Sequence, residues 1–355
     1  MMNRMLITGG CGFVGSSLAL SFKRHYPHMS VICLDNLKRR GSELNIARLK
    51  SSAVEFVHGD IRNKEDLEGL DHSDVIIECS AEPSVLAGYN SSPQYLVNTN
   101  LMGTINCLEL ARENTAAFIF LSTSRVYPIK TISCLNIEET YTRFELSDQQ
   151  DVTGASQKGF SEQFPLDGAR SLYGATKLAS ELILQEYVDM YGVKGVVNRC
   201  GLLTGPWQFG KVDQGVIVHW IARHFWMQRL SYIGFGGLGK QVRDILHVDD
   251  LFRLIDTQLS RIDDHIGQTY NVGGGRDVSL SLKELTSLCE RYTGNRVEID
   301  RVTQNRAADI PIYLTDHSKV IGVTGWRPQR TPDDIVEEIS LWVKENERTL
   351  EGILK

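Results

Sequence analysis

The residue types best suited to chemistry begin in a glycine-rich segment at the N-terminus. Residues Leu6 to Gly15 read L-I-T-G-G-C-G-F-V-G, so an apolar strand runs directly into glycines at positions 9, 12 and 15. In such a segment the first glycine permits a tight turn, the second lets the backbone approach a pyrophosphate, and the third lets the next helix pack on the strand. The N-terminus of that helix then faces the anion. The segment predicts dinucleotide contacts at Gly9, Gly12, Phe13, Val14 and Gly15.

An acidic residue follows the next apolar run. Val31 to Leu34 leads into Asp35, about 20 residues after the glycines, where a carboxylate can bind the ribose hydroxyls of an adenosine. A carboxylate would repel a 2′-phosphate, so Asp35 favours NAD over NADP, and its neighbour Asn36 is a further expected cofactor contact. A basic trio close by could receive that phosphate, which keeps NADP as the alternative: Lys38, Arg39 and Arg40.

A second set of residues can handle protons. The segment Phe118 to Tyr127, F-I-F-L-S-T-S-R-V-Y, ends an apolar run in hydroxyl residues, and Tyr173 precedes Lys177 by one helical turn in Y-G-A-T-K. A phenol with its ordinary pKa of about 10 is a poor base at neutral pH. A lysine on the same helix face stabilises the phenolate and lowers that pKa. The set suits oxidation of a sugar alcohol, with hydride passing to a nicotinamide.

The elements that must position these groups follow an α/β pattern. Strand-like apolar runs alternate with helical periodicity, at 5–8, 31–35, 54–58, 75–78, 117–122 and 195–199. This alternation predicts a doubly wound parallel sheet of Rossmann type, with ligands at the carboxyl ends of the strands. A further strand is expected at 268–272 and an amphipathic helix at 333–346. The polar stretch 128–170 is predicted to be a long connection, a functional or mobile loop.

The length of the chain predicts two domains. The 355 residues divide into a nucleotide-binding domain and a smaller substrate-binding domain. The first is expected to comprise 1–200 and about 240–275, and the second about 201–239 and 276–355. Helical segments at 93–113 and 173–191 could pair with the same helices of a second subunit, which predicts a homodimer or homotetramer. Burial inside one subunit is the alternative.

Composition argues against several other classes of protein. The net charge is −6 and basic residues are scattered, so neither a nucleic acid nor a membrane surface is an expected partner. Seven cysteines lie singly without C-x-x-C spacing, which predicts a reducing cytoplasm and gives no metal-binding pattern. The first strand begins at once, and no apolar run reaches about 18 residues. Neither export nor membrane insertion is expected.

In order and separation, these motifs resemble the extended short-chain dehydrogenase/reductase family, which uses the G-x-x-G-x-x-G spacing found here. The resemblance implies that Thr123 is the catalytic hydroxyl, that Tyr173 is the base and acid, and that Lys177 modulates Tyr173 and binds the nicotinamide ribose. It also implies further cofactor contacts: Asp60 and Ile61 beside the adenine, Ser80 and Ala81 after the fourth strand, and Asn100 bracing the active-site backbone.

Residues in the C-terminal half are candidates for binding a nucleotide sugar. Arg243 lies in K-Q-V-R-D-I-L-H-V-D-D and Arg306 in N-R-A-A-D-I-P-I-Y, and a planar guanidinium suits a diphosphate. The family resemblance places phosphate-binding arginines at both motifs and a substrate-contacting tyrosine at Tyr313. Surface salt bridges are the alternative for the arginines. The resemblance places Tyr232 in the segment where such enzymes hold the nucleobase. Packing in the protein core explains an aromatic residue at this position equally well.

Within the family, the chain resembles the CDP-paratose 2-epimerases over nearly its whole length. The most specific shared pieces are E-T-Y-T-R-F-E-L, V-D-Q-G and G-K-Q-V-R-D. The resemblance implies inversion at C2 of a CDP-sugar through a transient ketosugar, with substrate contacts at Ser84, Thr123 and Ser124. Where that group usually reads A-A-Q-P-S and S-T-N-K-V-Y, this chain has Glu82, Ser124 and Arg125. These departures leave the sugar itself open.

Other activities stay open at this point. Dehydratases of the family follow the catalytic threonine with an Asp-Glu pair, and Ser124-Arg125 supplies neither acid, which argues against 4,6-dehydration. An NDP-sugar 4-epimerase or an NAD-dependent NDP-sugar dehydrogenase is the alternative enzyme. A dinucleotide-binding regulatory protein without catalysis is the alternative from another class, and the complete set of Thr123, Tyr173 and Lys177 argues against it.

Overall fold

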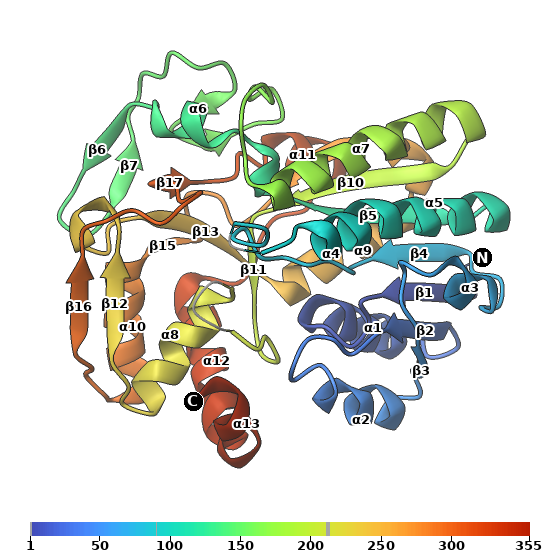
Figure 1. The fold of residues 1–355 in the computed structure, drawn as a ribbon, viewed down its shortest axis with the longest axis horizontal. Helices are drawn as coiled ribbons and strands as arrows, with labels where there is room; N and C mark the ends of the chain where they lie inside the picture. Colours follow the sequence, from blue (N-terminus) through green and yellow to red (C-terminus); the bar gives the residue numbers. More distant parts are fainter. Residues whose placement is uncertain (1, 90, 211–213) are drawn as a thin grey trace. The chain divides into compact units, whose positions relative to one another are not determined.

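The computed structural model describes residues 2–89, 91–210 and 214–355, and its central feature is a seven-stranded, mostly parallel sheet (Figure 1). Val212 and Asp213 of the V-D-Q-G motif lie outside the described residues. The strands run in the order β14 (Thr269–Val272), β10 (Lys194–Cys200), β5 (Ala117–Thr123), β4 (Val75–Glu78), β1 (Arg4–Thr8), β2 (Ser30–Asp35) and β3 (Glu55–His58).

The order of these strands confirms the doubly wound prediction. β1 pairs in parallel with both β2 and β4, and the pairs β2 with β3 and β4 with β5 are also parallel. The chain therefore builds outward from β1 in one direction and then in the other, and the order reverses between β1 and β4. Ligands of such sheets bind at this switch point, outside the carboxyl ends of the strands. The glycine segment follows β1 there.

The chain divides into two compact units. The first comprises residues 1–126, 171–199 and 251–270, and the second comprises 127–170, 200–250 and 271–355. The stretch 127–170 thus groups with the second unit, whereas the sequence prediction assigned it to the nucleotide-binding domain. The predicted ligand-binding roles of the two domains stay predictions.

Helices in the first unit cover the strands through apolar side chains. They are α1 (Phe13–His25), α2 (Leu44–Ser51), α3 (Lys64–Glu68), α4 (Gln94–Val97), α5 (Gly103–Asn114), α7 (Leu172–Tyr191) and most of α9 (Val248–Ser260). α5 packs on β4 and β5 and against α7, while α1 packs on β1 and β2. Phe118 and Phe120 of β5 join Cys107 of α5 and Leu184 of α7 in one buried cluster. This cluster fixes α7 on the sheet.

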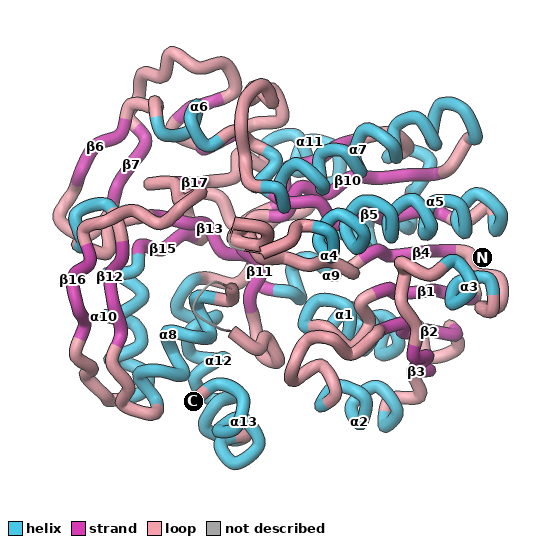
Figure 2. Tube along the Cα trace, viewed as in Figure 1, coloured by secondary structure: helices cyan, strands magenta, loops and turns pink. Residues whose placement is uncertain are grey.

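Short strands and helices make up the second unit (Figure 2). β13 (Val242–His247) pairs with β11 (Leu202–Thr204), β15 (Ser279–Ser281) and β17 (Ile312–Tyr313), and β12 (Leu230–Ile233) pairs with β16 (Ile299–Val302). The helices are α6 (Ile129–Ser133), α8 (Val216–Phe225), α10 (Leu282–Thr293), α11 (Ser318–Thr324), α12 (Pro332–Glu345) and α13 (Glu347–Leu354).

Two predicted segments differ from their expected form. The stretch 128–170 is not structureless, because it contains α6 and two hairpins, β6 (Ile137–Glu139) with β7 (Phe144–Leu146) and β8 (Ala155–Ser156) with β9 (Gly159–Phe160). The helix expected at 93–113 is interrupted between α4 and α5 by a π-helical turn, Asn98–Met102. π-Turns inside helices often occur at functional positions. This one contains Asn100.

Candidate active site

The glycine segment has the geometry of a loop built to approach a ligand. A Cβ atom on Gly15 would lie 2.3 Å from the backbone oxygen of Gly9, so this position is closed by the protein itself. A Cβ on Gly12 would meet only that oxygen, at 3.1 Å, within 4 Å. Protein packing therefore explains Gly15, whereas at Gly12 one backbone oxygen would have to move by a few tenths of an ångström. The space beside Gly12, at the start of α1, fits the pyrophosphate of a dinucleotide.

Asp35 is held in place at the carboxyl end of β2. Its Oδ2 accepts a hydrogen bond from the Cys11 N–H at 3.0 Å, and its Oδ1 accepts one from the Leu37 N–H at 2.8 Å. Burial raises the pKa of Asp35, and these backbone N–H groups oppose that shift because they favour the charged form. A carboxylate fixed beside the glycine segment fits the ribose hydroxyls of NAD.

Polar groups next to Asp35 include two of the residues predicted to bind the adenosine, Asn36 and Asp60. Asn36 Nδ2 donates to Asp60 Oδ2 at 2.8 Å, and Arg62 binds the same carboxylate with its guanidinium. Burial opposes ionisation of Asp60, but the Arg62 and Asn36 hydrogen bonds outweigh it and lower the pKa of Asp60 to about 2. Lys38 Nζ lies 3.9 Å from the centroid of the Tyr95 ring. Its ammonium therefore already has a partner, which weakens the argument for a 2′-phosphate.

The proposed catalytic residues all lie in the first unit. Ser171 caps α7 by accepting the Gly174 N–H at 3.2 Å, so Tyr173 lies in the first turn and Lys177 one turn later. Lys177 is buried, and its Nζ lies 3.9 Å from the centroid of the Phe120 ring. Phe120 precedes Thr123 by three residues in β5, and α7 packs on β5 and on the turn after it, so the hydroxyl end of β5 lies against α7.

Asn100 ties the loop after β4 to α7. Its Oδ1 accepts the Glu82 N–H at 2.8 Å, and its Nδ2 donates to the Glu82 carbonyl at 3.1 Å and to Thr176 Oγ1 at 3.3 Å. Asn100 thus holds the backbone of Glu82, and its predicted role in bracing an active site stays a prediction. The clamped loop carries Ser80, Ala81 and Ser84, so its position is set by a side chain from the π-turn.

A buried ion pair joins β10 to α7, the helix that carries Tyr173 and Lys177. It was not predicted from the sequence. Arg199 of β10 donates to both carboxylate oxygens of Glu181 in α7, at 3.0 and 2.7 Å to Oε2 and 3.1 Å to Oε1. Ser122, next to Thr123, also donates to Glu181. The two charged side chains are 7% and 5% exposed. The only sequence signal was an arginine inside an apolar strand.

In the second unit, the structure brings several candidate substrate residues together. Arg243 of β13 is the register partner of Tyr313 in β17. Arg243 Nη2 also donates to Asp309 Oδ1 at 2.9 Å, and Asp309 belongs to the turn whose backbone begins at Arg306. Tyr313 is buried and stacks on Phe160, with ring centroids 4.9 Å apart. Arg243, Arg306 and Tyr313 thus come from adjoining strands and one turn.

Tyr232 is engaged in packing. Its ring stacks on Trp220 with centroids 5.9 Å apart, and its hydroxyl lies 2.7 Å from Thr286 Oγ1. These contacts are what the core-packing alternative requires. A role for Tyr232 in binding the nucleobase of the substrate stays a prediction.

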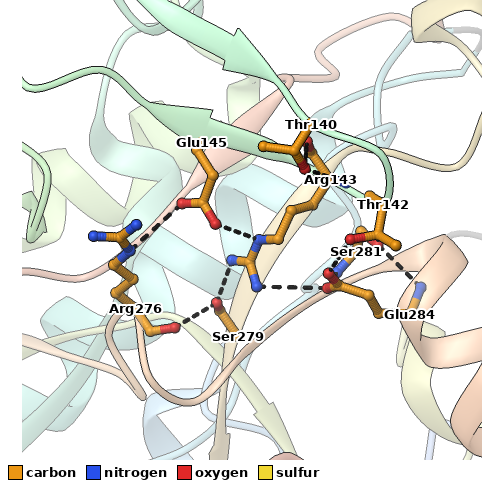
Figure 3. A network of polar contacts seen from close by, with 8 residues as sticks. All are labelled: Thr140, Thr142, Arg143, Glu145, Arg276, Ser279, Ser281 and Glu284. Atoms are coloured by element: carbon orange, nitrogen blue, oxygen red, sulfur yellow. Dashed lines mark hydrogen bonds and ion pairs between the residues drawn. The ribbon is translucent and has the colours of Figure 1, made fainter.

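The E-T-Y-T-R-F-E-L motif forms a polar network within the second unit (Figure 3). Arg143 pairs with Glu145 at 2.9 Å, donates to Ser279 Oγ at 2.6 Å and lies 3.5 Å from Glu284. Glu284 also accepts the Ser281 N–H in the capping box of α10. The motif therefore joins the hairpin β6–β7 to β15 and the start of α10. Its distinctive residues have a structural explanation in these contacts.

Over the described ranges, no group of three or more His, Cys, Asp or Glu side chains could hold a metal ion. Among the helices that the structure describes, none combines the length and apolar character needed to cross a membrane.

The glycine geometry gives a prediction. We expect Gly12→Ala to keep its fold but weaken NAD binding by about 1–3 kcal/mol, or roughly 5- to 150-fold, because the added methyl intrudes on the pyrophosphate. Gly322→Ala is the matched control, since a Cβ there meets nothing within 4 Å. Calorimetric titration of NAD-depleted protein measures the affinity. Equal affinity in both variants would remove Gly12 from the cofactor site.

The chain is similar to known proteins over nearly its whole length. The profile of the NAD dependent epimerase/dehydratase family matches residues 5–273. The chain is 33% identical to CDP-paratose 2-epimerase of Salmonella typhi, over 96% of this chain and 98% of the relative. It is 28% identical to dTDP-glucose 4,6-dehydratase of Mycobacterium tuberculosis, over 97% and 94%. Among solved structures, dTDP-glucose 4,6-dehydratase of Streptomyces venezuelae with NAD bound matches with a TM-score of 0.78 and 26% identity, over 99% and 100% of the two chains.

Proposed function

The chain belongs to the NAD dependent epimerase/dehydratase family, and from that premise we propose that it is a nucleotide-sugar epimerase inverting C2 of a CDP-sugar. The cofactor of this family is NAD. The observation that favours epimerisation over dehydration is the segment after Thr123. Ser124 and Arg125 supply neither the acid nor the base that elimination of water requires. Likeness to a CDP-paratose 2-epimerase over 96% of the chain supports C2 and cytidine over the alternatives.

In the proposed reaction, Tyr173 removes the proton of the sugar hydroxyl as the carbinol is oxidised. Thr123 orients the same oxygen, and Lys177 stabilises the phenolate through its positive charge. When bound along Gly12 and Asp35, NAD supplies the acceptor that takes the hydride and later returns it. After the ketosugar has rotated, its carbonyl carbon would present the opposite face to the returning hydride, and Tyr173 returns the proton to the carbonyl oxygen. Arg243 and Arg306 are the proposed ligands of the diphosphate.

The test follows the hydrogen. A CDP-sugar deuterated at C2, incubated with the protein as purified and without added NAD, is expected to emerge inverted at C2 with deuterium still on C2. The same reaction with unlabelled sugar in D₂O is expected to leave C2 free of deuterium. NMR of the product measures the configuration and the deuterium content at C2 in both reactions. Comparing turnover of the same sugar linked to CDP, UDP and GDP then shows which nucleobase the protein prefers.

Each of the other possible results would indicate a different reaction. Solvent deuterium at C2 would overturn the hydride mechanism in favour of deprotonation at carbon. Inversion at C4 would move the enzyme to the 4-epimerases, and accumulation of reduced NAD would make it a dehydrogenase. Loss of water from the sugar would place it with the dehydratases instead.

A further inference from the structure

A buried glutamate lies close enough to Lys177 to feel its charge. Glu78 ends β4 and has 0% of its surface exposed. Its Oε1 accepts a hydrogen bond from Thr104 Oγ1 at 2.7 Å, whereas no described residue donates to its Oε2. A buried carboxylate with one hydrogen bond is unfavourable unless an opposite charge lies near it.

Lys177 supplies that opposite charge. Glu78 and Phe120 are register partners in neighbouring parallel strands, so their side chains project from the same face of the sheet. Lys177 Nζ lies 3.9 Å from the Phe120 ring centroid, on this face, and Lys177 is 1% exposed. Burial raises the pKa of Glu78 to about 7, although the charge of Lys177 and the Thr104 hydrogen bond both lower it.

The other titratable group facing this pair is Cys107 of α5, which feels the charges of both Glu78 and Lys177. Burial raises the pKa of the Cys107 thiol well above its ordinary value, so the thiol stays neutral at working pH. Thr104, the remaining polar contact from α5, carries no charge. Among the described residues, the charged groups that face each other here are therefore Glu78 and Lys177, and Tyr173 lies one turn earlier on α7.

We propose that Glu78 is a positioning residue that acts through Lys177, supplying the buried negative charge that keeps the ammonium protonated. This inference rests on the proposed role of Lys177 in stabilising the Tyr173 phenolate. An ammonium taken out of water loses its proton easily unless a carboxylate offsets the loss of hydration. The charge of Glu78 therefore matters most at alkaline pH, where Lys177 without it would lose its proton and could no longer support Tyr173.

The test measures the titration of Lys177 directly. In protein carrying ¹³C at lysine Cε, the Lys177 signal is assigned by its loss in Lys177→Met. We expect Glu78→Gln, which keeps the shape and the Thr104 hydrogen bond, to lower the pKa of Lys177 by about one unit or more. Cys107→Ala is the matched control, because it changes the packing beside Glu78 and Lys177 without removing a charge. It should leave the pKa of Lys177 unchanged. An unchanged Lys177 titration in Glu78→Gln would overturn the proposal.

Two further measurements keep the outcome decisive. If Glu78→Gln does not fold, the reciprocal experiment uses Lys177→Met, in which the Glu78 carboxyl should titrate at a higher pH than in the parent protein; an unshifted carboxyl would count against the pairing. In active protein, the alkaline limb of the kcat profile should move to lower pH in Glu78→Gln only. The titrations need no substrate, so they test the pairing of Glu78 with Lys177 separately from the epimerase assay that tests the proposed function.

Discussion

We expect Tyr173→Phe to lower kcat about 10²- to 10⁴-fold, the usual contribution of a general acid–base group, while the fold and the bound NAD are kept. The substitution removes one proton-bearing oxygen and little volume. Lys177 and Thr123 remain, so substrate binding should change far less than turnover. Steady-state kinetics with the CDP-sugar, together with the cofactor content of the purified variant, separates the two effects.

The matched control is Tyr191→Phe, at the far end of the same helix. Tyr191 is 52% exposed, and its loss of a hydroxyl should leave kcat within about twofold of the parent, because surface substitutions rarely exceed about 0.5 kcal/mol. Near-normal turnover in Tyr173→Phe would remove Tyr173 from proton transfer. An equal loss in both variants would point to a general defect of α7.

The sequence predicts the sheet well because its signals are local. The strand at 75–78 matches β4 to the residue, those at 5–8 and 31–35 differ from β1 and β2 by one residue at the start, and that at 195–199 is one residue shorter than β10 at each end. Short apolar runs bounded by glycine or polar residues are sufficient for this. The α/β class and the family resemblance are confirmed by the strand order and by the family match.

The features that the sequence did not predict depend on distant partners. The π-turn within 93–113 arises where Asn100 binds the backbone of Glu82, 18 residues earlier, and no helical spacing encodes that contact. Glu78 and Arg199 looked like ordinary strand ends. Their burial depends on Thr104 and Glu181, which other elements bring to the sheet. Long-range pairing of this kind is invisible to periodicity.

The second large effect is expected at the buried ion pair. Arg199→Ala should destabilise the protein by about 3–5 kcal/mol, because it leaves the Glu181 carboxylate buried without its cation. Arg229→Ala is the matched control: Arg229 pairs with Glu298 at 2.8 Å, but the two side chains are 60% and 73% exposed. An exposed pair contributes about 0–1 kcal/mol. Thermal and urea unfolding measure the difference.

The double variant Arg199→Met with Glu181→Leu separates a charge effect from a packing effect. Replacing both members of a buried pair by apolar residues of similar volume is often neutral, so the double variant should recover much of the stability that Arg199→Ala loses. A double variant as unstable as the single one would show that Arg199 acts through packing. Because Glu181 lies one turn after Lys177 on α7 and also holds Ser122 beside Thr123, restored stability need not restore turnover. We expect the double variant to fold, to bind NAD and still to turn over more slowly than the parent, since the strand end and the helix that carry the proposed catalytic groups are no longer joined.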